Sequence, residues 1–296
     1  MEAARIPARS RRQAMDWSLV LVSQGIETVI EQSEADGSWG LLIPAQDSER
    51  AFKSLRQYRL ENRSWPWRQK LPWPDVHFNP VAALWVLLLI LFHWLAAASG
   101  LELRTAGTMY SSAVLGGQWW RIFTSMMLHA DIAHLAANLS IGVVLLGLAM
   151  GRYGAGVGIL AAYLAGAAGN LASLWLNSRT FYGLGASGMV MGALGLLAAQ
   201  SLATRKHDAR QPLKYLLGGE AAGIMLFILF GLSPSPGTDI VAHLGGFLAG
   251  LMLGAALAFA PVSMLKNLRS NLLAGSAFAI IVVITWRLAL NAGKLF

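Results

Sequence analysis

The sequence contains no cysteine among its 296 residues. Disulfide bonds, thiol nucleophiles and thiolate metal sites are therefore excluded. Charged residues are also scarce, at 13% of the chain, which is about half of their usual share in a globular protein. Apolar residues make up 55%. This composition is typical of a polytopic membrane protein rather than of a soluble enzyme.

The N-terminus lacks the short apolar core of a cleaved signal peptide. It begins with Arg5, Arg9, Arg11 and Arg12 among mixed polar residues, so we expect the first apolar span to direct insertion itself. The net charge of +8 does not indicate nucleic acid, because the basic residues flank apolar segments, as orientation signals do. We therefore expect no nucleic-acid partner.

Apolar segments that approach or reach the length needed to cross about 30 Å of hydrocarbon follow residue 80. The segment 100–132 is too long for a tight connection, and we expect it to rest partly in the interface. The predicted fold is an all-α polytopic bundle with seven transmembrane helices. The spans are expected at 81–99, 133–150, 154–176, 186–203, 213–231, 240–260 and 270–290.

Residues 1–62 mix charged and apolar positions and predict a small, soluble α+β module. Their pattern indicates the order α-β-β-α, with the turn signal Asp36-Gly37 between the strands. Residues 63–80 combine prolines with tryptophans and basic residues. That composition is typical of a linker at the headgroup level, where tryptophan is enriched.

Lysine and arginine are unevenly distributed over the connections between the predicted spans. Most of the 23 basic residues precede the first span or follow the second, fourth and sixth spans. Because cytoplasmic connections carry an excess of Lys and Arg, we place the N-terminus in the cytoplasm and the C-terminus outside.

With this orientation the second, fourth and sixth spans all run inward from the outer face. Polar residues near their starts then share one depth, roughly 6 to 10 Å below the outer surface. His134 and Asn138 stand one turn apart on one helical face, Ser187 opens the fourth span, and His243 opens the sixth. Since polar groups are expensive in hydrocarbon, this layer is the candidate site.

Glycines mark the helix faces that would bring Ser187 and His243 together, because small residues let helices approach closely in membranes. A serine within hydrogen-bond reach of a histidine is an activated nucleophile. No carboxylate at this depth orients His243, so we predict a dyad, with His134, Asn138 and the Ser187 backbone N–H as donors to an oxyanion. The glycines are Gly185, Gly188, Gly192 and Gly195 in the fourth span and Gly246, Gly250 and Gly254 in the sixth.

Three other interpretations fit parts of this pattern. The glycines could form only a packing face with an incidental serine, and the histidines could bind a metal, although no carboxylate completes such a site. A transporter is the main alternative from another class, but it predicts polar groups at the bilayer centre, whereas these lie near one surface. Glu220 is the exception, since it lies away from this surface. Asn170 is expected to make a hydrogen bond that packs two helices together.

These residues resemble the rhomboid family of intramembrane serine proteases over roughly residues 80–260. Each motif falls at the start of the helix where the family has it. The matching elements are Trp120-Arg121, His129, His134 with Asn138, Gly185-Ala186-Ser187-Gly188, and Ala242-His243-Leu244-Gly245-Gly246 followed by Gly250.

The resemblance implies that Ser187 is the nucleophile and His243 the general base and acid. It implies oxyanion-stabilising roles for His134 and Asn138. Three supporting residues complete the set: Gly185 shapes the approach to the nucleophile, and His129 and Met191 support the site.

Two features depart from the commonest bacterial form of the family. Residues 261–296 add a helix, which resembles a six-plus-one arrangement. Met191 stands where many relatives place a Tyr or Phe that packs on the catalytic histidine, and methionine can fill space and contact a ring. Non-catalytic rhomboid-like proteins typically lack the serine or the histidine, and both are present here. A non-catalytic binder of membrane proteins is nevertheless an alternative to the enzyme.

The function implied by the resemblance is cleavage of single-span membrane proteins near the outer face of the bilayer, without a cofactor. The implied partners are transmembrane protein substrates and the lipid bilayer, and the implied location is the bacterial inner (plasma) membrane. We expect a cytoplasmic module at 1–62, an interfacial linker at 63–80, a catalytic core of six helices at 81–260 and an additional helix at 261–296.

Overall fold

The computed structural model describes residues 3–33, 37–62, 77–98, 103–177, 181–200, 213–232 and 238–292. The chain divides into two compact units, Met1–Pro72 and Trp73–Phe296. Most of the predicted linker 63–80, including its tryptophans, and the side chain of Glu220 lie outside the described residues.

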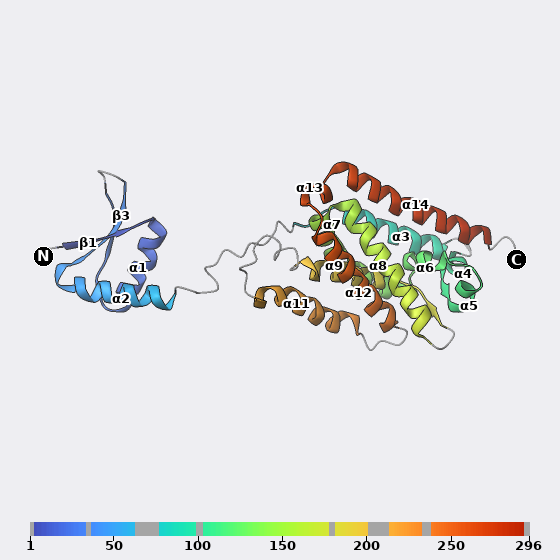
Figure 1. Cartoon of the computed structure of the whole chain (residues 1–296), viewed down its shortest axis with the longest axis horizontal. Helices are drawn as coiled ribbons and strands as arrows, with labels where there is room; N and C mark the ends of the chain where they lie inside the picture. Colours follow the sequence, from blue (N-terminus) through green and yellow to red (C-terminus); the bar gives the residue numbers. More distant parts are fainter. Residues whose placement is uncertain are drawn as a thin grey trace. The chain divides into compact units, whose positions relative to one another are not determined.

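The first unit is a three-stranded antiparallel sheet with two helices (Figure 1). Strand β3 lies in the middle and pairs with β1 and β2. Trp17, Leu21 and Leu41 are among the side chains that form its own hydrophobic core. The elements are β1 (Ala3–Ala8), α1 (Arg11–Ser23), β2 (Val29–Gln32), β3 (Trp39–Pro44), a 3-10 turn (Ala45–Asp47) and α2 (Ser48–Glu61).

The predicted order α-β-β-α was wrong for this unit, because it lacked strand β1. The inward positions of β1 are Ala4, Ile6 and Ala8, and only Ile6 has a strong preference for strands. Pro7 further weakens the pattern, although a proline is tolerated here because β1 is an edge strand.

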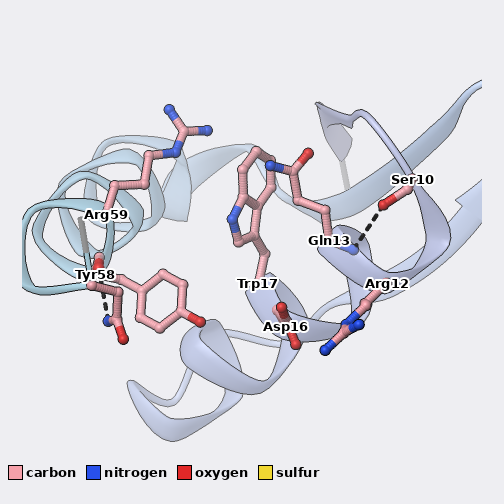
Figure 2. A pocket seen from close by; sticks show the side chains of 8 residues that line it. Ser10, Arg12, Gln13, Asp16, Trp17, Tyr58 and Arg59 are labelled. Carbon is pink, nitrogen blue, oxygen red and sulfur yellow. Dashed lines mark hydrogen bonds between the residues drawn. The ribbon is translucent and has the colours of Figure 1, made fainter. Parts of the chain in front are cut away.

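Helices α1 and α2 meet beside a surface hollow of the first unit (Figure 2). The Arg59 guanidinium lies 4.5 Å from the centre of the Trp17 ring. Ser10 caps α1 by accepting a hydrogen bond from the Gln13 N–H at 3.3 Å. The contact of Arg59 with Trp17 ties the end of α2 to α1.

In the second unit, each of the seven predicted apolar segments coincides with a helix (Figure 1). Among the described residues, four helices are long and apolar enough to cross a membrane, namely α7, α8, α12 and α14. The total of seven spans stays a prediction. The helices are α3 (Ala82–Ala98), α7 (Ile132–Tyr153), α8 (Ala155–Leu176), α9 (Ser187–Ala198), α11 (Leu213–Gly231), α12 (Ile240–Ala258) and α14 (Leu268–Ala292), with the short α13 (Val262–Leu265) before the last.

Helices α8, α9 and α12 form the centre of this unit and contact one another more extensively than other helix pairs do. Glycines make this possible. A Cβ atom placed on Gly246 of α12 would collide with the Gly188 carbonyl of α9, and one on Gly250 would collide with the Gly192 carbonyl. The predicted contact between the glycine faces of the fourth and sixth spans is therefore confirmed.

The connection before α7 is folded rather than extended. Its elements are α4 (Leu103–Gly107), β4 (Met109–Tyr110), α5 (Ser111–Leu115), α6 (Arg121–Thr124) and η3 (Ser125–Met127). Arg121 holds it together by donating to the carbonyls of Thr105 and Thr108 at 2.7 and 2.6 Å. Asn170 of α8 donates to the Ile122 carbonyl at 2.7 Å, which confirms its packing role. This connection forms a platform beside the start of α9.

Candidate active site

Ser187 is the first residue of α9 and is half-buried. The turn before it depends on Gly185, whose φ of 126° strongly favours glycine. The platform fixes this turn in two places: β4 pairs with β5 (Tyr182–Gly183), and the Gly185 N–H donates to the Ser125 carbonyl at 3.0 Å. The serine is thus presented from a turn whose backbone has little freedom.

His134 lies against the same turn. A Cβ on Gly185 would stand 2.8 Å from His134 Cε1 and 2.9 Å from Nε2, so glycine also makes room for the imidazole. Asp131 caps α7 by accepting from the His134 backbone N–H at 2.8 Å. Asn138, one turn further along, is 7% exposed, and its Nδ2 donates to the His134 carbonyl at 2.9 Å.

His129 supports the turn from the other side. Its Nε2 accepts a hydrogen bond from the Ala186 N–H at 3.4 Å, and its ring centre lies 5.2 Å from that of His134. Arg104 in turn donates to the His129 carbonyl at 3.0 Å. The structure therefore brings His129, His134 and Gly185 together, two residues before Ser187.

His243 belongs to the surface of α12 that packs on α9. Its neighbours Ala242 and Gly246 both face Gly188, the residue that follows Ser187. The ring is buried, with 7% of the residue exposed. Within the described part of the chain, however, the Ser187 hydroxyl makes no hydrogen bond, so a direct link between serine and histidine stays a prediction. Met191 is buried at 3% exposure, and its contact with His243 is likewise untested.

Comparison with known proteins shows a match over the region that contains the candidate site residues. Residues 116–259, which contain every candidate site residue, match the family model of the rhomboid domain. The chain therefore carries a rhomboid domain. With this domain and four long apolar helices among its described residues, it is a multi-pass integral membrane protein.

Named relatives agree with this assignment. The chain is 33% identical over 178 residues to the rhomboid protease GluP of Bacillus subtilis (strain 168), covering 59% of this chain and 33% of that protein. It is 28% identical over 219 residues to the rhomboid protease AarA of Providencia stuartii, covering 65% and 77%. It is 30% identical over 185 residues to RHOMBOID-like protein 1 of Arabidopsis thaliana, covering 60% and 44%. The match thus spans about a third of the first relative's length.

One group in this rhomboid site was missed by the sequence reasoning. His243 Nδ1 lies 2.7 Å from the carbonyl oxygen of Gly231, the last residue of α11. A carbonyl can only accept, so Nδ1 is the donor in this hydrogen bond, and in the neutral imidazole the lone pair is then on Nε2. The sequence could not indicate this partner, because it is a backbone atom that any residue would supply.

Asp239 has a different role from the one a triad would require. It caps α12 by accepting from the Ala242 N–H at 2.9 Å and is hydrogen-bonded to the Ser173 hydroxyl of α8. Neither of these contacts involves His243. The rhomboid site therefore uses this carboxylate to hold α12 against α8.

Burial of His129 makes the stability of the folded protein depend on pH. Burial is the main cause that lowers its pKa to about 3, with smaller contributions from His134 and His93. In the unfolded chain the pKa returns to about 6.5. Between these values the unfolded chain binds one more proton than the folded chain, so the contribution of His129 to stability is complete above pH 6.5 and is lost as the pH falls toward 3.

We therefore expect the folded protein to lose up to about 1.4 kcal/mol of stability per pH unit through this one group below pH 6.5. His129→Gln keeps an acceptor for the Ala186 N–H but cannot titrate. Thermal unfolding in detergent from pH 7 to 4 should show a flatter acid limb for this variant. Identical slopes for the two proteins would mean that the His129 proton equilibrium is not linked to folding.

Proposed function

We propose that this chain is an intramembrane serine endopeptidase in which Ser187 attacks the peptide carbonyl and His243 accepts its proton. The observation that carries this proposal is the glycine contact between α9 and α12, which sets the residues flanking His243 against Gly188. We infer that a side-chain rotation, without movement of the helices, joins the hydroxyl to the imidazole.

The Gly231 carbonyl supports the same assignment. Because Nδ1 donates to this oxygen, Nε2 is the nitrogen left to accept the serine proton. The carbonyl dipole also stabilises the imidazolium that forms when the proton arrives. A backbone group thus takes the orienting position that a carboxylate holds in a catalytic triad.

The oxyanion of the tetrahedral intermediate would form at the N-terminus of α9. Backbone N–H groups in the first turn of a helix have no intrahelical partner, and the helix dipole favours negative charge there. His134 lies against Gly185 at this end. Asn138 uses one amide hydrogen on the His134 carbonyl, which leaves its second hydrogen for the oxyanion.

The substrates we propose are single-span membrane proteins that are cut near the outer face of the bilayer. The excess of basic residues in the connections at the opposite end supports a cytoplasmic N-terminus and an external C-terminus. The inner membrane of a bacterium is the location we propose. In this topology the first unit is cytoplasmic.

A liposome assay with a model single-span substrate tests the activity. We expect the wild-type chain to release two fragments whose new ends lie near one membrane face, and a phosphonofluoridate, which reacts with activated serines, to label Ser187. Solute flux across the liposome without cleavage would favour a transporter. Substrate binding with neither cleavage nor labelling would favour a non-catalytic binder.

His134→Ala and Asn138→Ala should lower turnover more than substrate affinity, because their donors act on charge that exists only in the transition state. Loss of one such donor costs on the order of 10² to 10³ in rate. Measured kcat and KM separate the two effects. A raised KM at constant kcat would place these side chains in the substrate-binding pocket instead.

Met191 is expected to tune the site. It lies one turn from Ser187 on the same face of α9 and is buried, so its thioether can pack beside the His243 ring. Met191→Ala should reduce turnover less than loss of His243 does, and Met191→Phe should retain activity. Rates are normalised to folded protein, because the cavity left by Met191→Ala can lower the folding stability by about 2 to 5 kcal/mol. An unchanged rate in Met191→Ala would show that this side chain does not orient His243.

A further inference from the structure

A buried arginine, to which the described residues supply no hydrogen-bonding or ionic partner, lies at the end of α7 opposite the candidate active site. Arg152 is 6% exposed, and its Nε is enclosed without a hydrogen-bond partner. Its two terminal amino groups are not enclosed in this way and form no hydrogen bond or ion pair with the described residues. At 1.5 Å per residue, this guanidinium is about 27 Å from His134 along the helix.

This arrangement is energetically unfavourable unless a further group binds. A buried charge needs a partner of opposite sign and hydrogen bonds for its donors. The contact observed is with the face of Tyr153, whose ring centre is 5.5 Å from the guanidinium carbon. That ring offsets part of the cost but accepts no N–H bond in the plane of the guanidinium. Among the described residues, no acceptor binds the donor pair at its tip.

The surroundings of Arg152 are basic. Asn271 of α14 binds the α7–α8 turn by accepting from the Gly156 N–H at 3.0 Å, and this contact places the start of α14 beside that turn. Lys266 and Arg269, both exposed, lie at this junction. The acidic side chains described in this unit, Asp131 and Asp239, instead cap the starts of α7 and α12, at the active-site end.

We propose that Arg152 binds the phosphate of an anionic phospholipid in the headgroup layer at this end of the bundle. Guanidinium groups bind phosphate oxygens with two parallel hydrogen bonds, which matches the free donor pair. Lys266 and Arg269 add attraction for a lipid of net negative charge. A lipid phosphate, unlike a protein carboxylate, is always available beside a spanning helix, and basic pockets between such helices are known to bind lipid headgroups.

Native mass spectrometry of the full-length protein in neutral detergent tests this site with phosphatidylglycerol and phosphatidylcholine as probes. We expect one phosphatidylglycerol to bind more tightly than phosphatidylcholine. Arg152→Gln should weaken that binding by on the order of tenfold to a hundredfold, the usual value of charge-assisted hydrogen bonds. Arg287→Gln is the matched control, since it removes the same charge from an exposed position of α14 and should bind as the wild type does.

Thermal unfolding gives an independent readout. In lipid-free detergent, Arg152→Gln should be as stable as the wild type or more stable, because it removes an unpaired buried charge. Phosphatidylglycerol should raise the melting temperature of the wild type and not that of the variant. Equal affinity of the wild type for both lipids, or unchanged phosphatidylglycerol binding in Arg152→Gln, would overturn the proposal. Inorganic phosphate that reproduced the full shift would assign the site to a soluble anion instead of a lipid.

Discussion

Ser187→Ala and His243→Ala are each expected to reduce cleavage of a membrane substrate by at least about four orders of magnitude. In the proposed mechanism the serine supplies the attacking oxygen and the imidazole removes its proton, so loss of either stops the same step. Residues that act as one unit have non-additive losses. The double variant should therefore be no slower than the slower single variant. Turnover in liposomes, normalised to folded protein, is the measurement.

Ser140→Ala is a matched control for this experiment. Ser140 lies on α7 and is exposed, and among the described residues its hydroxyl donates only to the Ala137 carbonyl, at 3.0 Å. Its loss should leave both folding and turnover unchanged. Near-native cleavage by Ser187→Ala or by His243→Ala, with Ser140→Ala behaving as expected, would show that the two residues do not form a catalytic unit.

The site could be predicted as far as side chains and helical spacing determine it. His134 and Asn138 are one turn apart in the sequence, and that spacing puts them on one face of any helix. The glycines of α9 and α12 likewise predicted a close contact, because only a residue without a Cβ leaves room for a neighbouring carbonyl. Polar side chains in an apolar chain are conspicuous, so the candidate residues themselves were found without a structure.

The sequence could not indicate the backbone partners of these residues. The Gly231 carbonyl that binds His243 and the Ala186 N–H that binds His129 belong to groups that every residue carries. Which backbone group approaches His243 depends on where α11 ends. Which one approaches His129 depends on the conformation of the turn before Ser187. Both follow from contacts between segments far apart in the chain, such as the pairing of β4 with β5.

In the first unit, strand β1 likewise could not be predicted from the sequence. Helices α1 and α2 have clear apolar periodicity, whereas β1 presents alanines at two of its three inward positions. Alanine has little preference for strands, so the strand forms because it can pair with β3 over six residues. The pairing with β3, rather than the local sequence, therefore makes this segment a strand.

Gly246→Ala is expected to have the second largest effect, and Gly188→Ala, directly across the same interface, is expected to be tolerated. A Cβ on Gly246 would collide with the Gly188 carbonyl and lie 3.1 Å from the Gly188 carbonyl carbon. These are backbone atoms that cannot rotate away. The helices would have to separate by roughly 1 Å, because packed interiors have no spare volume. A misplacement of that size can reduce turnover on the order of 10²-fold.

Gly188→Ala makes the same chemical change without this collision. Its Cβ would stand 3.5 Å from the Gly166 carbonyl oxygen and 3.7 Å from that of Ala242, which are ordinary contacts. Alanine also favours a helix over glycine by about 1 kcal/mol, so this variant should be at least as stable as the wild type. Turnover and melting temperature of the two variants in the same detergent make the comparison. Equal turnover in both variants would mean that the distance between α9 and α12 does not control catalysis. A loss of turnover confined to Gly188→Ala would mean that Gly188 acts through its own backbone flexibility rather than through the space it leaves for α12.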